Sequence, residues 1–387
     1  MSLTKEEISE LIDLRRHFHR YPEIAFKEEK TANFIADRLG RYGYKITRGI
    51  AKTGVLAELK GNFPGDWIML RADMDALPVQ EETKLPFESA HPGIMHACGH
   101  DAHIAILLTV AKNLVQYKER IKGGIKILFQ PAEECGSGAV ECLKHPGLLD
   151  NPKIKAALGL HVWQDLPTGY VGITPGPVMA GVMQYKITIN GKGGHGAIPE
   201  ETVDPVVAAA HLITLVQTIV SRNVSPLDTG VVTVGLLNGG TAFNIIPEKV
   251  ILEGTARYFR QSVGDLIYRR IDEILKGLDL TFGTNCSISY DQLTPPLVND
   301  TYISEQVLSV ARKLFPKEKI RTDIMTMGGE DMSYIANKVP CCFFLIGSGN
   351  PEKDAIYPHH SKFFKIDEDS LQYGYDLLFE AALNLTT

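Results

Sequence analysis

Two kinds of hydrophobic pattern alternate along the first 180 residues. Apolar residues at helical spacing over 9–39, broken at Tyr21-Pro22, predict helical structure, and the apolar run 104–114 predicts another helix. Short apolar runs predict buried strands at 54–59, 67–70, 124–129 and 154–162. Strands that alternate with helices indicate a largely parallel sheet with helices on both faces.

The pattern changes at Gly176-Pro177. From there the order of elements is strand, helix, two strands, helix and strand, which is the βαββαβ order of ferredoxin-like domains. The predicted ranges are 183–189, 204–220, 231–237, 249–258, 262–278 and 286–290. Thr294-Pro295-Pro296 ends this segment.

The rest of the chain returns to the first pattern. It predicts helices at 303–314 and 332–336, strands at 321–325 and 341–346, and a last helix from Glu368. We therefore predict a discontinuous α/β catalytic domain, residues 1–180 and 294–387, whose sheet is mixed but largely parallel. A ferredoxin-like lid and dimerisation domain, residues 181–293, is inserted into it.

Composition narrows the class of protein. The chain has 387 residues, 44% of them hydrophobic and 22% charged, as in ordinary globular proteins rather than disordered or coiled-coil chains. Its net charge of −6 argues against a nucleic-acid partner. We read no apolar run near the roughly 18 residues of a membrane span and no secretory signal, so we expect a cytoplasmic protein without a membrane partner. Six irregularly spaced cysteines fit a reducing compartment.

The most informative motif is the run from His96 to His103, which precedes an apolar helix. Cys98 and His100 are residue types that bind zinc and its neighbours in the transition series. Gly99 allows the chain to turn between them, and Asp101 could fix a histidine tautomer from the second shell. The alternative is a histidine-rich surface loop.

A second motif, Gln130-Pro131-Ala132-Glu133-Glu134, directly follows a buried strand. Ligands bind at the carboxyl ends of strands in open α/β sheets, and two carboxylates there allow one to bind metal and the other to move protons. The alternative is an acidic helix start. Further polar groups at strand ends or in loops are Asp73, Asp75, His161, His359 and His360.

The inserted segment carries its own polar candidates. His195 lies in the glycine-rich stretch 191–196, which presents it on a mobile loop or forms an ordinary hairpin with an incidental histidine. Arg257 suits a substrate carboxylate through its two-pronged geometry or makes a surface ion pair. Asn244 belongs to the same segment.

Taken together, these motifs resemble those of the metal-dependent amidohydrolases of the aminoacylase and carboxypeptidase G class. The nearest branch contains hippurate hydrolases, N-acetyldiaminopimelate deacetylases, auxin-conjugate hydrolases and thermostable carboxypeptidases. The resemblance covers nearly the whole chain. It rests on Arg71–Pro78, His96–His103, Gln130–Glu134, Gly193-Gly194-His195 and Met327–Asp331.

The resemblance implies a site for two divalent metal ions, zinc first, with manganese, cobalt or nickel as alternatives. The implied ligands are Cys98, His100, Glu134, His161 and His360, the last chosen over His359 because it precedes Ser361. Glu133 is the implied general base, and Asp101 and Asp75 are implied second-shell groups. His195 is implied to enter a partner's active site, which requires a homodimer or a dimer of dimers, with Asn244 and Arg257 holding substrate.

The activity that follows is hydrolysis of the amide bond of N-acyl amino acids, as in aminoacylases and hippurate hydrolases. A carboxypeptidase that releases C-terminal residues from short peptides is the alternative with the same chemistry. A non-catalytic protein stapled by structural zinc is the more distant alternative, and the extra carboxylate of Glu133 speaks against it.

Overall fold

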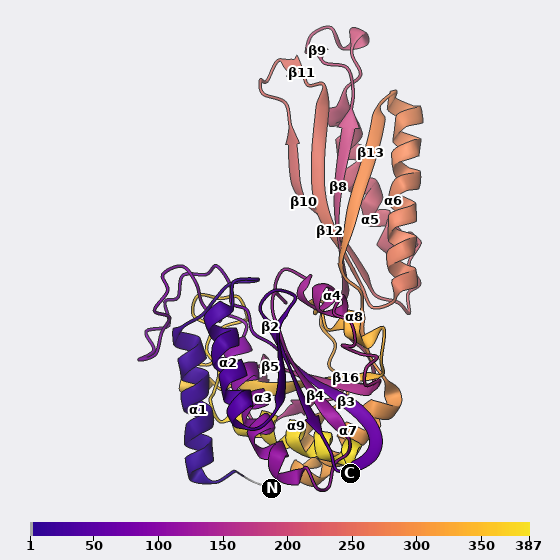
Figure 1. Ribbon diagram of the computed structural model, residues 1–387. Helices are drawn as coiled ribbons and strands as arrows, with labels where there is room; N and C mark the ends of the chain where they lie inside the picture. Colours follow the sequence, from indigo (N-terminus) through magenta and orange to yellow (C-terminus); the bar gives the residue numbers. More distant parts are fainter. Residues whose placement is uncertain (1–2) are drawn as a thin grey trace. The chain divides into compact units, whose positions relative to one another are not determined.

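The computed structural model describes residues 3–387, which form two compact units (Figure 1). Unit 1 comprises 3–178, 298–325 and 331–387, and unit 2 comprises 179–297 and 326–330. The short segment 326–330 was assigned to the α/β domain from sequence. It belongs to unit 2 because Thr326 bridges to Met179, and the peptide N–H of Ala180 donates to the carbonyl of Gly328 at 2.9 Å.

Unit 1 is built on an eight-stranded mixed sheet whose central strands are parallel. In spatial order the strands are β1 (Lys45–Ile50), β2 (Gly54–Lys60), β4 (Lys122–Gln130), β3 (Phe63–Asp73), β5 (Ile154–Pro167), β16 (Cys341–Gly349), β6 (Val171–Gly172) and β15 (Ile320–Arg321). The antiparallel pairs are β1 with β2, β2 with β4, and β16 with β6. The predicted fold class is confirmed, but the strand expected at 321–325 reaches only Arg321.

Helices cover both faces of this sheet unequally. One face carries α1 (Lys5–Arg20), α2 (Glu29–Arg41), α3 (His100–Leu114), α7 (Thr301–Leu314) and α9 (Ser370–Thr386). The other carries the short helices α4 (Gly138–Leu143) and α8 (Ser333–Ala336). Neighbouring strand residues show the division: Leu70 packs against α3 and α9, whereas Arg71 reaches Asp331, which binds the α4 backbone.

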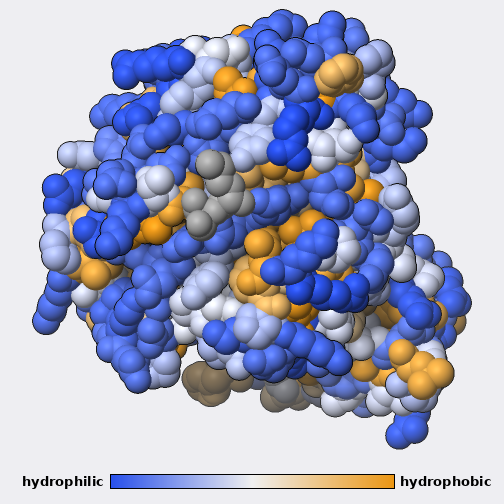
Figure 2. All heavy atoms as spheres, turned by 90° about the horizontal axis from the view of Figure 1, so that it is seen from below, coloured by the Kyte–Doolittle hydropathy of each residue, from blue (hydrophilic) through white to orange (hydrophobic). Residues whose placement is uncertain are grey.

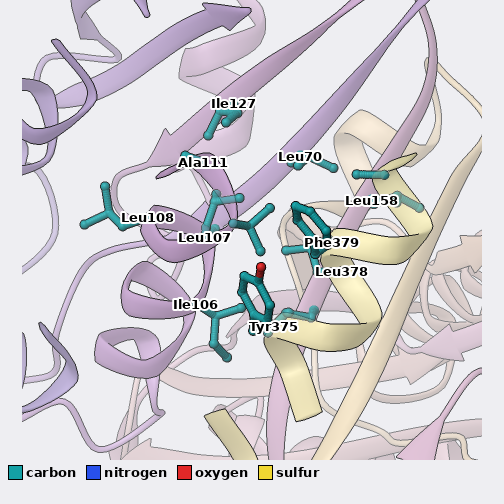
Figure 3. Packing of buried hydrophobic residues seen from close by; sticks show 14 of the residues in the cluster. Leu70, Ile106, Leu107, Leu108, Ala111, Ile127, Leu158, Tyr375, Leu378 and Phe379 are labelled. Atoms are coloured by element: carbon teal, nitrogen blue, oxygen red, sulfur yellow. The ribbon is translucent and has the colours of Figure 1, made fainter. Parts of the chain in front are cut away.

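The core of unit 1 lies between the sheet and the larger helical layer. Figure 3 shows Leu107 and Ala111 of α3 and Phe379 of α9 gathered around Leu70 of β3. All four side chains are essentially inaccessible to solvent. Figure 2, a view of one outer face, is mostly hydrophilic, with hydrophobic residues in separate small groups. Burial of these apolar side chains stabilises the sheet whose strand ends carry the polar motifs.

Unit 2 is a four-stranded antiparallel sheet with two helices. Its elements in chain order are β8 (Gly181–Asn190), α5 (Pro205–Arg222), β10 (Gly230–Gly239), β12 (Lys249–Tyr258), α6 (Gln261–Phe282) and β13 (Asn285–Thr294). This is the predicted βαββαβ order. A separate two-stranded antiparallel sheet pairs β9 (Gly194–His195) with β11 (Ile245–Ile246). A further pair joins β7 (Gly176–Met179) to β14 (Leu297–Asn299), and most residues of both strands belong to unit 1.

Helix α5 differs from the sequence expectation in one respect. It is long and apolar enough to pass a length and composition test for a membrane span, although we expected no such run. Its buried residues, among them Leu212, Val216 and Ile219, belong to the core of unit 2. Its other face exposes Val206 and Val207. A core helix with a second apolar face accounts for this composition.

Candidate metal centre

The polar motifs of unit 1 lie at the carboxyl ends of three neighbouring strands, β4, β3 and β5. Asp73, the last residue of β3, pairs with Gln130, the last residue of β4. On the other side of β3, Arg71 pairs with Gly159 of β5, so His161, two residues further, lies level with Asp73. This is the edge at which open α/β sheets bind ligands.

Gly99 makes the sharp turn that brings Cys98 and His100 to this edge. It adopts a left-handed conformation, φ 87°, directly before α3 begins at His100. A Cβ atom at this position would lie 2.4 Å from a methyl group of Val162, so glycine is required for both reasons. Sγ of Cys98 lies 3.5 Å from Nε2 of His161.

Asp75 fixes the two adjacent glutamates. Its two carboxylate oxygens accept the peptide N–H groups of Glu133 and Glu134, each at 3.0 Å. The preceding residue, Ala132, is left-handed, and its N–H donates to Glu28 at 2.9 Å. Three successive N–H groups are thus held by buried carboxyl groups, which sets the directions of the two glutamate side chains.

The two adjacent histidines of the last loop have different surroundings. His360 is left-handed, its N–H donates to the carbonyl of Ala97 at 2.8 Å, and its Nε2 lies 3.4 Å from Glu134. His359 instead donates from Nε2 to the carbonyl of Val162 at 3.0 Å and packs against Trp163. Only His360 joins the cluster of candidate ligand atoms.

The candidate ligand atoms fall into two groups that share one thiol. Cys98, His100 and His161 form one group, and Cys98, Glu134 and His360 form the other, with the ligand atoms of each group within 4.8 Å of one another. A further group joins His100 to Glu133 and Glu134. Two overlapping groups suit two neighbouring cations.

An unsatisfied pair of atoms shows that these residues fit a metal. Nε2 of His100 and Oε1 of Glu134 are buried, 3.8 Å apart, and neither has a hydrogen-bond partner within residues 3–387. Buried polar atoms are nearly always paired. One of the two atoms is an imidazole nitrogen and the other a carboxylate oxygen, both of which bind zinc, so their burial at this point fits a cation site. A thiol, three imidazoles and a carboxylate are a donor set that zinc and cobalt favour.

Without a cation, the side chains of the site favour their protonated forms. Burial, together with the charges of Glu134 and Glu133, raises the pKa of the Cys98 thiol well above its usual value. Burial also raises the pKa of Glu134. Burial alone would lower the pKa of His100, but Asp73 and Asp75 outweigh it and raise that pKa to about 10. The thiolate of Cys98 and the carboxylate of Glu134 therefore need a positive partner such as a metal ion.

Asp101 lies away from the cluster. Its Oδ2 is 2.8 Å from Nδ1 of His19 and 2.8 Å from Nε of Arg15. It therefore orients His19, not a histidine of the cluster. Asp75 does serve the cluster, through the peptide N–H groups above and through its own carbonyl, which accepts from Nδ1 of His100 at 2.9 Å.

The other predicted residues lie in unit 2. His195 is exposed in the two-stranded β9–β11 sheet, where it pairs with Ile245, and the carbonyl of Asn244 accepts the N–H of Gly196 at 2.9 Å. Arg257 lies near the other end of β12 and donates to the carbonyl of Met327 at 3.2 Å. His195 and Asn244 thus lie at one end of the four-stranded sheet of unit 2, and Arg257 lies at the other.

Sequence reasoning assigned no role to a buried network beneath the cluster. Arg71 donates to Gln130, Asp73 and Asp331, and Asp73 in turn accepts from His103 at 2.6 Å. The alternation of Arg71 and Asp73 along one strand is a signal that could have indicated it, since residues two apart share a face.

Comparison with known proteins decides the family. The model of peptidase family M20/M25/M40 matches residues 69–384. The chain belongs to this family. An N-acetyl-L-cysteine deacetylase of Bacillus subtilis is 40% identical over 376 residues, 97% of this chain and 88% of the relative. Thermostable carboxypeptidase 1 of Saccharolobus solfataricus is 34% identical over 94% of this chain and 92% of its own.

A solved structure from the same family agrees. A Bacillus subtilis protein described as a dinuclear metal-binding peptidase superposes with a TM-score of 0.87 at 32% identity, over 98% of both chains. The protein is therefore an enzyme, a metal-dependent M20 amidohydrolase or carboxypeptidase, from a family of dinuclear metal-binding peptidases. These relatives leave its substrate and its metal open.

Proposed function

We propose that this protein hydrolyses the amide bond of N-acyl amino acids, with two divalent ions, zinc first, held by Cys98, His100, Glu134, His161 and His360. The observation that carries the proposal is the pair of overlapping ligand groups that share the Cys98 thiol. Glu133 adjoins them and is not needed to complete either group. A structural zinc site is closed by its protein ligands and has no use for an additional carboxylate beside them.

The bound ions would supply activation of a water molecule and polarisation of the amide carbonyl. Glu133 would accept the proton of the attacking water and return it to the leaving amine. Its Oε1 accepts the N–H of Asp331 at 3.3 Å, which orients the carboxylate. His195 would donate to the oxyanion that forms on the carbonyl, an effect worth about 3–4 kcal/mol.

A homodimer is part of the proposal, and the length of β12 supports it. From Lys249 to Arg257 the strand rises roughly 26 Å, at about 3.3 Å per residue. His195 and Asn244 lie beyond its first end, and Arg257 lies near its last. A substrate of one acyl group and one amino acid is much shorter, so groups from both ends serve one site only if two subunits contribute.

The edge of the small sheet supports pairing between copies. β10 is an edge strand with exposed Leu236 and Leu237, and α5, which packs on β10, exposes Val206 and Val207. An unpaired edge with apolar flanks pairs readily with a second chain. Six free cysteines, without a disulfide among residues 3–387, support a reducing compartment such as the cytoplasm.

A substrate panel tests the proposed activity. The metal-reconstituted enzyme is assayed with N-acetyl amino acids, hippurate and unblocked dipeptides, and kcat/KM is compared. The proposal expects the N-acyl amino acids to be preferred. A preference for dipeptides would favour the carboxypeptidase alternative, which the Saccharolobus relative represents. Absence of hydrolysis across the panel would contradict both.

A further inference from the structure

The last histidine of the His96–His103 run, His103, is buried and belongs to none of the candidate ligand groups that contain Cys98; it lies instead with Asp73 and His100. His103 projects from the first turn of α3 toward β5. Its Nδ1 lies 2.6 Å from Oδ1 of Asp73, and its Nε2 lies 2.9 Å from the backbone nitrogen of Val162. Both ring nitrogens are therefore engaged inside the protein.

These two contacts fix the proton of His103. The backbone N–H of Val162 can only donate, so Nε2 of His103 must accept and carries no hydrogen. Nδ1 then carries the hydrogen and donates to Asp73. Asp73 also accepts from Arg71 at 2.8 Å, so its carboxylate is held in turn. The ring has one orientation and one tautomer.

The backbone of Val162 connects His103 to His161, a residue of the proposed metal site. β5 runs on past Asp73, where β3 ends, so β3 offers no partner to Val162. Its N–H binds His103 instead, and its carbonyl accepts from Nδ1 of His161 at 2.6 Å. With its hydrogen on Nδ1, His161 presents the lone pair of Nε2 toward Cys98.

We propose that His103 is a positioning residue for the metal centre, which orients His161 through the backbone of Val162. This rests on the proposed metal site. Groups that orient a metal ligand typically contribute about 10–100-fold to metal affinity. Because His161 belongs to the group with His100 and not to the group with Glu134 and His360, the effect falls on one of two ions.

Two amide variants separate this role from simple packing. In His103→Gln the amide oxygen reaches the position of Nε2 and can accept the Val162 N–H. In His103→Asn the shorter amide reaches only the position of Nδ1 and keeps Asp73 alone. Thr109→Val is the control: it removes a buried hydroxyl of α3 that donates to the carbonyl of Ala105 on the same helix.

Cobalt(II) binding to the chelator-treated protein is measured by competition with a chromophoric chelator, and thermal unfolding checks that each variant is folded. We expect wild type, His103→Gln and Thr109→Val to bind two ions alike. His103→Asn should bind one ion about 10–100-fold more weakly. Equal weakening in both amide variants, or none in His103→Asn, overturns the proposal. A wild-type protein that binds no metal overturns this proposal and the metal site together.

Discussion

Sγ of Cys98 lies 3.5 Å from Nε2 of His161, although 63 residues separate them in the chain. Cys98 lies just before the first residue of α3, and His161 lies on β5 at the level where β3 ends. The thiol also belongs to the group with Glu134 and His360. Cys98 is therefore the side chain that the two groups assigned to the proposed ions have in common.

Replacing Cys98 by serine should weaken both ions at once. The hydroxyl is a poor ligand for zinc and cobalt, and no thiolate would remain between the two groups. We expect fewer than two tightly bound zinc ions per chain by elemental analysis after dialysis. Cys142→Ser is the control, since that cysteine is also buried but lies on α4 outside the cluster. Two zinc ions retained in Cys98→Ser would contradict the shared-ligand geometry.

Glu133→Gln should separate metal binding from turnover. The amide keeps the size of the side chain but cannot accept the proton of water, so kcat should fall by about 10²–10⁴. The metal content should stay that of wild type. Glu141→Gln, on the exposed side of α4, serves as the control. Near-normal turnover in Glu133→Gln would remove Glu133 from the mechanism.

The sequence predicts these local motifs because each occupies the end of a recognisable strand or helix. Cys98-Gly99-His100 and Glu133-Glu134 are short, and their neighbours determine where they point. The groups that hold them were not predictable, because they come from distant segments. Glu28 binds Ala132 across 104 residues, and Arg71 binds Asp331 across 260. Only the fold brings such pairs together.

The assignment of Asp101 shows the same limit. Its position beside His100 in sequence predicted a contact with a metal histidine, but one residue along a helix rotates a side chain by about 100°. Asp101 therefore faces α1, where His19 lies. The short strand β15 is a second case. The residues 321–325 favour a strand by composition, but beyond Arg321 no neighbouring strand pairs with them in the described chain.

His195→Ala should lower kcat without changing metal content, because the side chain lies in unit 2 and would act on a partner's substrate. The direct check is mixing His195→Ala with Glu133→Gln under conditions that exchange subunits. A mixed dimer keeps one site with both groups intact, so activity should rise toward a quarter of wild type in an equal mixture. No recovery after proven exchange would contradict action across subunits.

The buried contact of His19 with two acids should make stability depend on pH. Nδ1 lies 2.8 Å from Asp101 and Nε2 lies 3.0 Å from Glu81, so both nitrogens donate and the ring is positively charged. Burial and Arg15 alone would lower the pKa of His19, but these bonds outweigh them and raise it. The stabilisation is therefore complete below the unfolded pKa of about 6.5 and is lost as the pH rises through the folded pKa.

His19→Gln should accordingly destabilise the protein by about 3 kcal/mol at mildly acidic pH, and by less at alkaline pH, in denaturant unfolding at constant metal content. His17→Gln on the same helix is the control. Burial lowers the pKa of His17, so its contribution has the opposite dependence on pH. A loss in His19→Gln that is independent of pH would contradict a charged His19.

The central claim is a two-metal amidohydrolase, and one titration tests it most directly. Chelator-treated protein is given increasing zinc, and bound metal per chain and hydrolysis of an N-acetyl amino acid are measured on the same samples. We predict no hydrolysis without metal and full activity at two ions per chain. Full activity in the metal-free protein, or no hydrolysis with both ions bound, would contradict the account.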